Sequence, residues 1–194
     1  MTTKFIRNCA TGVFLAALSA PLLAQSITPM SGDAAANIGF NNLTGIDNKK
    51  HVEFGFSGGI NLNEYVAVLA EYNYLPQGSE TVSGMSVSGN YQLFGGAVRV
   101  APVKSKRVVP YGVFGFGYAR MGAAASFQGV NGSASVNGDY VSFGGGASIY
   151  CGQNWGLRPE YRWDRQMYKY YGNDYHQNES RGTIALFYQW GGKK

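Results

Sequence analysis

The segment W-G-L-R-P-E-Y-R-W at residues 155–163 indicates the fold of this chain more clearly than any other. In an extended strand, successive side chains point to opposite faces. Four apolar and aromatic side chains then share one face of the segment: Leu157, Pro159, Tyr161 and Trp163. The opposite face carries three charges within five residues: Arg158, Glu160 and Arg162. A helix would distribute these charges around its circumference, so the alternation predicts a β-strand.

Two kinds of fold suit a strand with one apolar and one charged face. In a soluble sandwich or barrel, the charged face contacts water and the apolar face forms the core. In a small membrane barrel the apolar face contacts lipid, and the charges pair in the interior. The remainder of the chain distinguishes these two arrangements.

The same alternation recurs in eight segments of roughly ten residues each, a length that suits a tilted membrane strand. They are residues 34–43, 52–62, 65–75, 88–100, 110–120, 140–150, 155–163 and 183–190. Short turns at residues 63–64, 102–106 and 152–154 alternate with longer polar loops at residues 44–50, 76–87, 122–138 and 169–181. Short turns at one end and long loops at the other are typical of outer-membrane barrels. The chain is therefore predicted to be all-β, an eight-stranded antiparallel up-and-down transmembrane β-barrel.

The first residues have the form of a secretory signal peptide. Lys4 and Arg7 precede an apolar run at residues 10–23, and Ala24 is a small residue before Gln25. The apolar run is short for a membrane anchor, because a spanning helix needs about 20 apolar residues. We expect residues 1–24 to be a cleaved signal peptide, residues 25–32 a flexible leader and residues 33–194 the barrel domain.

Composition excludes several function classes. After removal of residues 1–24 the chain carries 14 basic and 11 acidic residues, a net charge of +3, which does not predict nucleic-acid binding. Only Cys151 remains, so an intramolecular disulfide cannot form. The chain is rich in glycine and aromatic residues, with 28 Gly and 14 Tyr, and poor in proline. This composition favours an all-β fold.

The alternation places charged side chains opposite the apolar faces. We expect a lumenal ion-pair network of Glu53, Glu71, Arg99, Arg158, Glu160 and Arg162, with Asp164 as a further member. The interior of an eight-stranded barrel is only wide enough for side chains to fill. An isolated buried ion is costly, so these charges must pair. The network is either a plug that fixes strand register or an ion-pair gate on a narrow path.

Seven aromatic residues fall towards the ends of the predicted strands, on the apolar faces. They are Tyr72, Tyr74, Tyr118, Tyr161, Trp163, Tyr188 and Trp190. Tyrosine and tryptophan are typical of the two membrane interfaces, where one end of the ring is wet. We expect an aromatic girdle, whereas a soluble barrel would use the same residues for cross-strand packing.

The chain contains no catalytic, metal-binding or cofactor-binding motif. The histidines, His51 and His176, lack partners at the spacing of a metal site. Both fall at the rim with the long loops, so a serine–histidine lipid hydrolase is an alternative. The segment Y-K-Y-Y-G-N-D-Y at residues 168–175 is either an adhesive patch or a solvated loop.

The chain resembles the OmpA/OmpX/Opa-like family of small bacterial outer-membrane barrels over roughly residues 33–190. The resemblance rests on L-N-E-Y-V-A-V-L-A-E-Y-N-Y-L at residues 62–75, P-Y-G-V-F-G-F-G-Y-A-R at 110–120 and L-R-P-E-Y-R-W at 157–163. It implies export, insertion by the barrel-assembly machinery, and lumenal ion pairs at Glu71, Arg158, Glu160 and Arg162. Family members usually end on an aromatic residue recognised during assembly, whereas residues 191–194 follow Trp190 here.

These observations predict a monomeric, porin-like protein of the bacterial outer membrane and cell envelope, with a structural or surface-interaction role and at most a narrow, mostly closed pore. Its expected partners are outer-membrane lipid, the assembly machinery and an extracellular ligand bound by the long loops. The main alternative is a soluble exported ligand-binding barrel. Charged residues make up only 14% of the chain, which is few for a soluble surface.

Overall fold

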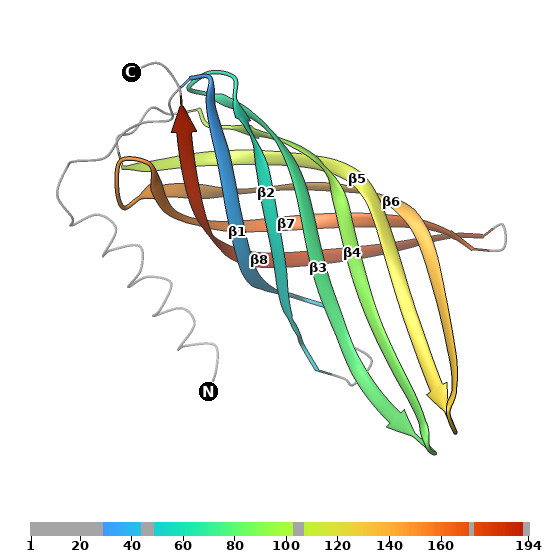
Figure 1. Cartoon of the computed structure of the whole chain (residues 1–194). Coiled ribbons are helices and arrows are strands. Elements are labelled where there is room, and N and C mark those ends of the chain that lie inside the picture. Colours follow the sequence, from blue (N-terminus) through green and yellow to red (C-terminus); the bar gives the residue numbers. More distant parts are fainter. Residues whose placement is uncertain (1–28, 44–48, 103–106, 171–172, 192–194) are drawn as a thin grey trace, which may run out of the picture.

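The computed structural model describes residues 29–43, 49–102, 107–170 and 173–191. These residues form eight antiparallel strands in a closed barrel, with each strand hydrogen-bonded to the next and β1 to β8 (Figure 1). The strands are β1 (Ser31–Asn41), β2 (Val52–Asn61), β3 (Val66–Val82), β4 (Met85–Val100), β5 (Val108–Phe127), β6 (Val130–Tyr150), β7 (Trp155–Tyr170) and β8 (Asn173–Gly191). The predicted fold class is therefore confirmed. No helix within the described ranges is long and apolar enough to span a membrane.

One end of the barrel, which we call the short-turn end, holds the start of β1 and the end of β8. Ser31 pairs with Gly191 across this seam. The turn between β2 and β3 is closed by the Asn63 side-chain oxygen, which accepts bonds of 2.8 Å from the backbone N–H groups of Tyr65 and Val66. Between β6 and β7, the backbone N–H of Cys151 donates to the Trp155 carbonyl oxygen at 3.1 Å.

The opposite end, which we call the hairpin end, differs from the prediction. Residues 76–87 and 122–138 were expected to be loops, which is wrong, because β3, β4, β5 and β6 continue through them. Ser83 and Gly84 alone turn the chain between β3 and β4, and Gln128 and Gly129 between β5 and β6, all with positive φ. Positive φ at both central residues is the geometry of a tight β-hairpin. Most of residues 169–181 also lie in β7 and β8, with residues 171–172 outside the described part.

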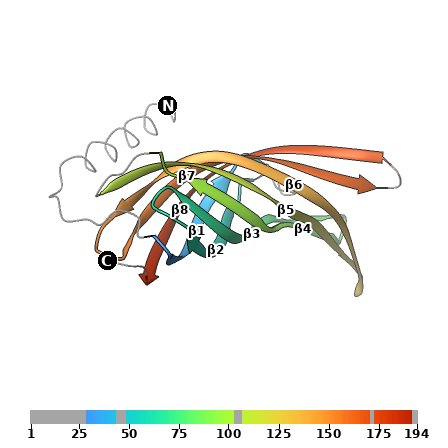
Figure 2. The same cartoon turned by 90° about the horizontal axis from the view of Figure 1, so that it is seen from above.

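The long strands continue beyond the ring as two separate sheets, which diverge in Figures 1 and 2. β2 and β3 are paired only as far as Phe54 and Tyr74, and β6 and β7 only as far as Gly138 and Tyr168. Beyond these points β3, β4, β5 and β6 stay paired with one another. We call residues 75–82, 85–91, 121–127 and 130–137 the four-stranded extension. The β7–β8 hairpin stands apart from it.

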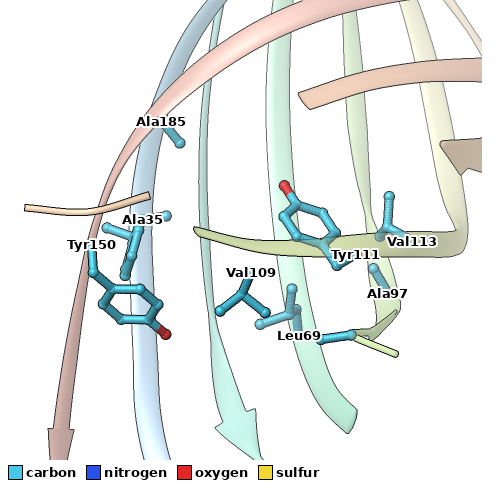
Figure 3. Close-up of a cluster of buried hydrophobic side chains, with 10 residues drawn as sticks. Ala35, Leu69, Ala97, Val109, Tyr111, Val113, Tyr150 and Ala185 are labelled. Carbon is cyan, nitrogen blue, oxygen red and sulfur yellow. The ribbon is translucent and has the colours of Figure 1, made fainter. Parts of the chain in front are cut away.

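The exterior of the ring is apolar and the interior is filled. Large side chains exposed on the outside include Phe56 (60%), Phe94 (62%) and Phe116 (58%). Inside, a cluster of ten buried residues occupies the short-turn end and includes Val109, Tyr111 and Tyr150 (Figure 3). A second buried cluster lies towards the hairpin end: Leu75, Leu93, Ala119, Tyr140 and Tyr168. Phe187 on β8 also faces inward and is 1% exposed.

Several predicted segments lie partly or wholly outside the described residues. The predicted signal peptide, residues 1–24, is among them, as are residues 44–48, 103–106 and 192–194. The expected leader at residues 25–32 reaches into β1, which begins at Ser31, two residues before the expected start of the barrel.

Candidate functional site

The lumen contains three clusters of charged side chains, and the first surrounds Asp33 on β1. Arg158 on β7 binds the Asp33 carboxylate with two bonds, Nη1 to Oδ1 at 3.1 Å and Nη2 to Oδ2 at 2.8 Å. Arg99 on β4 donates from Nη2 to Oδ2 at 2.9 Å, and Gln189 on β8 from Nε2 at 3.1 Å. Asp33 is fully buried. One carboxylate thus joins four strands; we call this the Asp33 cluster.

Aromatic rings and polar side chains enclose the two arginines of the Asp33 cluster. The guanidinium of Arg158 lies over the Phe187 ring at 4.3 Å and donates from Nε to the Ser148 hydroxyl at 3.2 Å. The guanidinium of Arg99 lies over the Tyr111 ring at 5.5 Å. A planar guanidinium can stack and hydrogen-bond at once, which suits it to a crowded interior. The packing fixes both cations.

The second cluster surrounds Arg162 at the middle of the lumen. Arg162 on β7 binds Glu71 on β3 with two bonds of 2.6 and 2.7 Å. Its Nε also donates to Glu160 Oε1 at 2.5 Å. The Tyr111 hydroxyl on β5 donates to the other Glu160 oxygen at 2.8 Å. This Arg162 cluster connects opposite walls of the barrel.

The third cluster surrounds Arg181 on β8, nearer the hairpin end. Arg181 Nε lies 2.7 Å from Asp164 Oδ2, and its Nη1 lies 4.0 Å from Glu53 Oε1. Gln166 Nε2 donates to Glu179 Oε2 at 2.7 Å, and the Tyr168 hydroxyl donates to Gln166 Oε1 at 2.5 Å. Two buried carboxylates, Asp164 and Glu53, therefore lie against one guanidinium, and a third, Glu179, is held by Gln166. We call Glu53, Asp164, Glu179 and Arg181 the Arg181 cluster.

The space left between these clusters is small. A void of about 10 Å³ adjoins Glu71, Arg162 and Arg181, and one of about 30 Å³ lies between Arg99 and Arg162. A cavity needs about 10–15 Å³ of such space to hold a single water molecule. The side chains and their ion pairs fill the interior.

The structure brings the predicted lumenal residues together and adds others. Glu53, Glu71, Arg99, Arg158, Glu160, Arg162 and Asp164 all point inward and are buried or nearly so. Sequence reasoning missed Asp33, Glu179 and Arg181. Asp33 lies near the start of a weakly patterned strand, although it is two residues from the inward-facing Ala35 and so points to the same face. Glu179 and Arg181 were assigned to a loop that is part of β8.

The predicted girdle residues occupy the outer face but not the strand ends. Tyr118, Tyr161, Tyr188 and Trp190 are 44–61% exposed, whereas Tyr72, Tyr74 and Trp163 are half-buried. Because β3, β5 and β7 continue towards the hairpin end, only Tyr188 and Trp190 lie near a strand terminus. Their ring centroids are 6.4 Å apart. The girdle remains a prediction about position in a membrane.

The residues considered for catalysis lie apart from the lumenal clusters. His51 is half-buried immediately before β2, and His176 is exposed on the β7–β8 hairpin opposite Met167. Among the residues that the structure describes, no group of three or more His, Cys, Asp or Glu side chains could hold a metal ion. In the segment 168–175, Tyr168 is buried, whereas Tyr175 is exposed.

A closed ring of antiparallel strands with an apolar exterior and an ionic interior defines an integral outer-membrane barrel. The chain belongs to the family described as "Outer membrane protein beta-barrel domain", whose sequence profile matches residues 10–184. The protein is accordingly located in the bacterial outer membrane. No curated protein sequence matches the chain significantly.

Solved structures show the same fold at low sequence identity. Ail of Yersinia pestis is 12% identical with a TM-score of 0.56, and the match covers 84% of this chain and 99% of that one. Neisserial surface protein A is 13% identical with a TM-score of 0.61, covering 83% and 97%. The N-terminal β-barrel domain of Pseudomonas aeruginosa OprF is 16% identical with a TM-score of 0.50, covering 84% and 99%.

Proposed function

We propose that this protein is a closed outer-membrane barrel whose four-stranded extension binds other proteins at the cell surface. In bacterial outer-membrane barrels the short turns face the periplasm and the longer connections face outward. With this orientation, the extension stands outside the cell. Eight residues beyond the ring, such as 130–137, correspond to about 25 Å of strand. It is a sheet rather than a set of loops, so its surface is preorganised for binding.

The observation that supports this proposal is the free edge of β6. Residues 130–137 pair with β5 on one side, but β7 joins β6 only from Gly138. An unpaired edge offers backbone N–H and C=O groups to an added strand. Natural proteins guard such edges with lysine, proline or bulges. The segment V-N-G-S-A-S-V-N has none of these residues, so the β6 edge is open to an extended peptide.

The other free edge of the extension, on β3, is guarded. Pro76 lacks a backbone donor, and the register with β4 shifts between Pro76 and Ser79. Gly78 has a φ of 71° within this irregular segment, and the charged Glu80 follows. These features hinder strand addition. The contrast between the two edges supports β6 as the binding edge.

A pore is the weaker candidate for the function of the lumen. Its charges are paired between different strands at 2.6–3.1 Å in the Asp33 and Arg162 clusters, and the remaining voids hold few waters. This arrangement supports a plug that fixes strand register. The lumen then serves stability and the extension serves binding.

The proposal is tested by adhesion of bacteria that display the whole protein to immobilised extracellular matrix proteins. Val130→Lys with Gly132→Lys adds charge to the β6 edge at exposed positions, and a Cβ on Gly132 meets no atom within 4 Å. We expect this variant to lose adhesion at least several-fold. The matched control, Ser79→Lys with Thr81→Lys on the β3 edge, keeps it. Equal adhesion by both variants and the parent, with equal surface expression, contradicts the proposal.

A further inference from the structure

A polar groove of about 290 Å³ lies on the outer surface of β4, β5 and β6, where the extension joins the ring. Its lining includes Asn90 and Gln92 from β4, Arg120 from β5, and Ser133 and Ser135 from β6. None of these residues belongs to the lumenal clusters or to the inner face of the sheet. The groove therefore has no role in the plug.

The floor of the groove is made by small residues. Gly122 and Ala124 lie between the polar side chains of the two neighbouring strands. A Cβ on Gly122 would lie 3.3 Å from the Asn90 side-chain oxygen, closer than most real Cβ contacts. The absence of a side chain at Gly122 thus keeps the groove open beside Asn90.

The walls of the groove offer donors and acceptors around one cation. Arg120 is exposed, and its Nη2 lies 3.4 Å from the Ser135 hydroxyl. Gln92 Nε2 donates to Asn90 Oδ1 at 3.3 Å, which leaves the Asn90 amide nitrogen available. Unlike the four lumenal arginines, Arg120 forms no ion pair within the part of the chain that the structure describes. The acidic residue nearest in register is Asp139, opposite Tyr118.

The strand register sets the level of this groove relative to the lipid. Phe94 and Tyr118 face each other on β4 and β5, and both are exposed on the apolar exterior. Gln92 and Arg120 are the next outward-facing pair towards the hairpin end. On β7, the exposed Arg165 likewise follows Trp163. On β4, β5 and β7, polar and cationic residues therefore begin where the large apolar side chains end, and we assign this level to the headgroups of the outer leaflet.

From this geometry we infer that the groove binds the phosphorylated sugar headgroup of an outer-leaflet lipid. A guanidinium binds phosphate oxygens through paired, charge-assisted hydrogen bonds. The amides and hydroxyls of Asn90, Gln92 and Ser135 match sugar hydroxyl groups, and the shallow floor accepts the ring. The apolar surface at Phe94 and Tyr118 lies directly below, where the acyl chains of the same lipid would pack. A soluble sugar phosphate lacks that second contact.

The test uses the full chain purified in detergent and transferred to phosphatidylcholine nanodiscs that contain either lipopolysaccharide or phosphatidylglycerol. We expect lipopolysaccharide to be retained with the parent protein and enriched over phosphatidylglycerol. Arg120→Gln should weaken this retention about tenfold, the loss of one charge-assisted contact, and Arg120→Lys by less. Lys169→Gln, which removes an exposed charge from the β7–β8 hairpin, is the matched control and leaves retention unchanged.

Gly122→Val fills the groove without altering charge, and we expect it to weaken retention as Arg120→Gln does. Each variant is first checked for heat-modifiable migration, so that a folding defect is not mistaken for loss of binding. Equal retention by the parent and by both Arg120→Gln and Gly122→Val overturns the inference. Equal enrichment of phosphatidylglycerol also overturns it, because the groove would then not select the sugar headgroup. Equal competition by a free sugar phosphate overturns it as well, because the lipid would then not be required for binding. Adhesion through the β6 edge does not enter this measurement, so the two proposals fail independently.

Discussion

The two ends of the lumen have opposite charge balances. At the short-turn end, one carboxylate, Asp33, receives bonds from two arginines and a glutamine. At the hairpin end, the Arg181 cluster holds three buried carboxylates and one guanidinium, which lies against Asp164 and Glu53, and neither oxygen of Glu53 accepts a hydrogen bond from the described residues. Neutralising one acid should therefore have very different consequences at the two ends. The comparison teaches that a lumenal carboxylate matters more where two cations share it than where carboxylates outnumber the cation.

The largest effect is expected for Asp33→Asn. This change leaves the buried cations of Arg99 and Arg158 without their carboxylate, and breaking one side of a buried pair costs about 3–5 kcal/mol. Urea unfolding in lipid vesicles, followed by tryptophan fluorescence, measures the loss. Asp174→Asn, at an exposed position of the β7–β8 hairpin, is the control and should leave the free energy of unfolding unchanged. A cost below about 1 kcal/mol for Asp33→Asn would show that the cluster does not hold the four strands together.

An intermediate effect is expected for Glu71→Gln. Arg162 loses its bidentate partner on β3 but keeps Glu160, so we expect a loss of about 1–3 kcal/mol in the free energy of unfolding. The same urea titration measures it. A loss as large as that of Asp33→Asn would mean that Glu160 does not compensate the charge of Arg162.

A small effect is expected for Glu179→Gln in the Arg181 cluster. The amide oxygen can still accept the bond from Gln166, and one of three crowded negative charges is removed. The free energy of unfolding should change by less than about 1 kcal/mol, or rise, because neutral replacements of buried charges are often tolerated. A marked loss of stability here would abolish the contrast between the two ends.

The smallest effect is expected on ion conduction. If the clusters form a plug, single channels of the parent and of Glu160→Gln in planar bilayers should both be closed nearly all of the time. Within the described residues, Glu160 is hydrogen-bonded to Arg162 and Tyr111, and its neighbours still fill the lumen. A clear rise in conductance for Glu160→Gln, with the fold retained, favours the ion-pair gate instead.

Side-chain parity predicted the inward faces of the strands, because a strand with one face in lipid must place its charges on the other. The alternation could not predict which of these charged residues pair with one another. Asp33 and Arg158 are separated by 125 residues, and only the ring closure and stagger bring them together. Nor could parity find the extension, where large apolar residues give way to small ones such as those at residues 122–126. Such composition is typical of loops, and only the two-residue turns at Ser83–Gly84 and Gln128–Gly129 indicate a hairpin.

The Asp33 cluster also bears on the order in which the barrel forms. Asp33 lies on the first strand, and its partner Gln189 lies on the last, 156 residues later. Until β1 and β8 meet along the seam from Ser31 to Gly191, the carboxylate and its arginines cannot all be satisfied. A partly closed sheet would expose these charges in lipid, where they are costly. Closure is therefore expected to be cooperative, with the last strand completing the ion pairs that the first strand began.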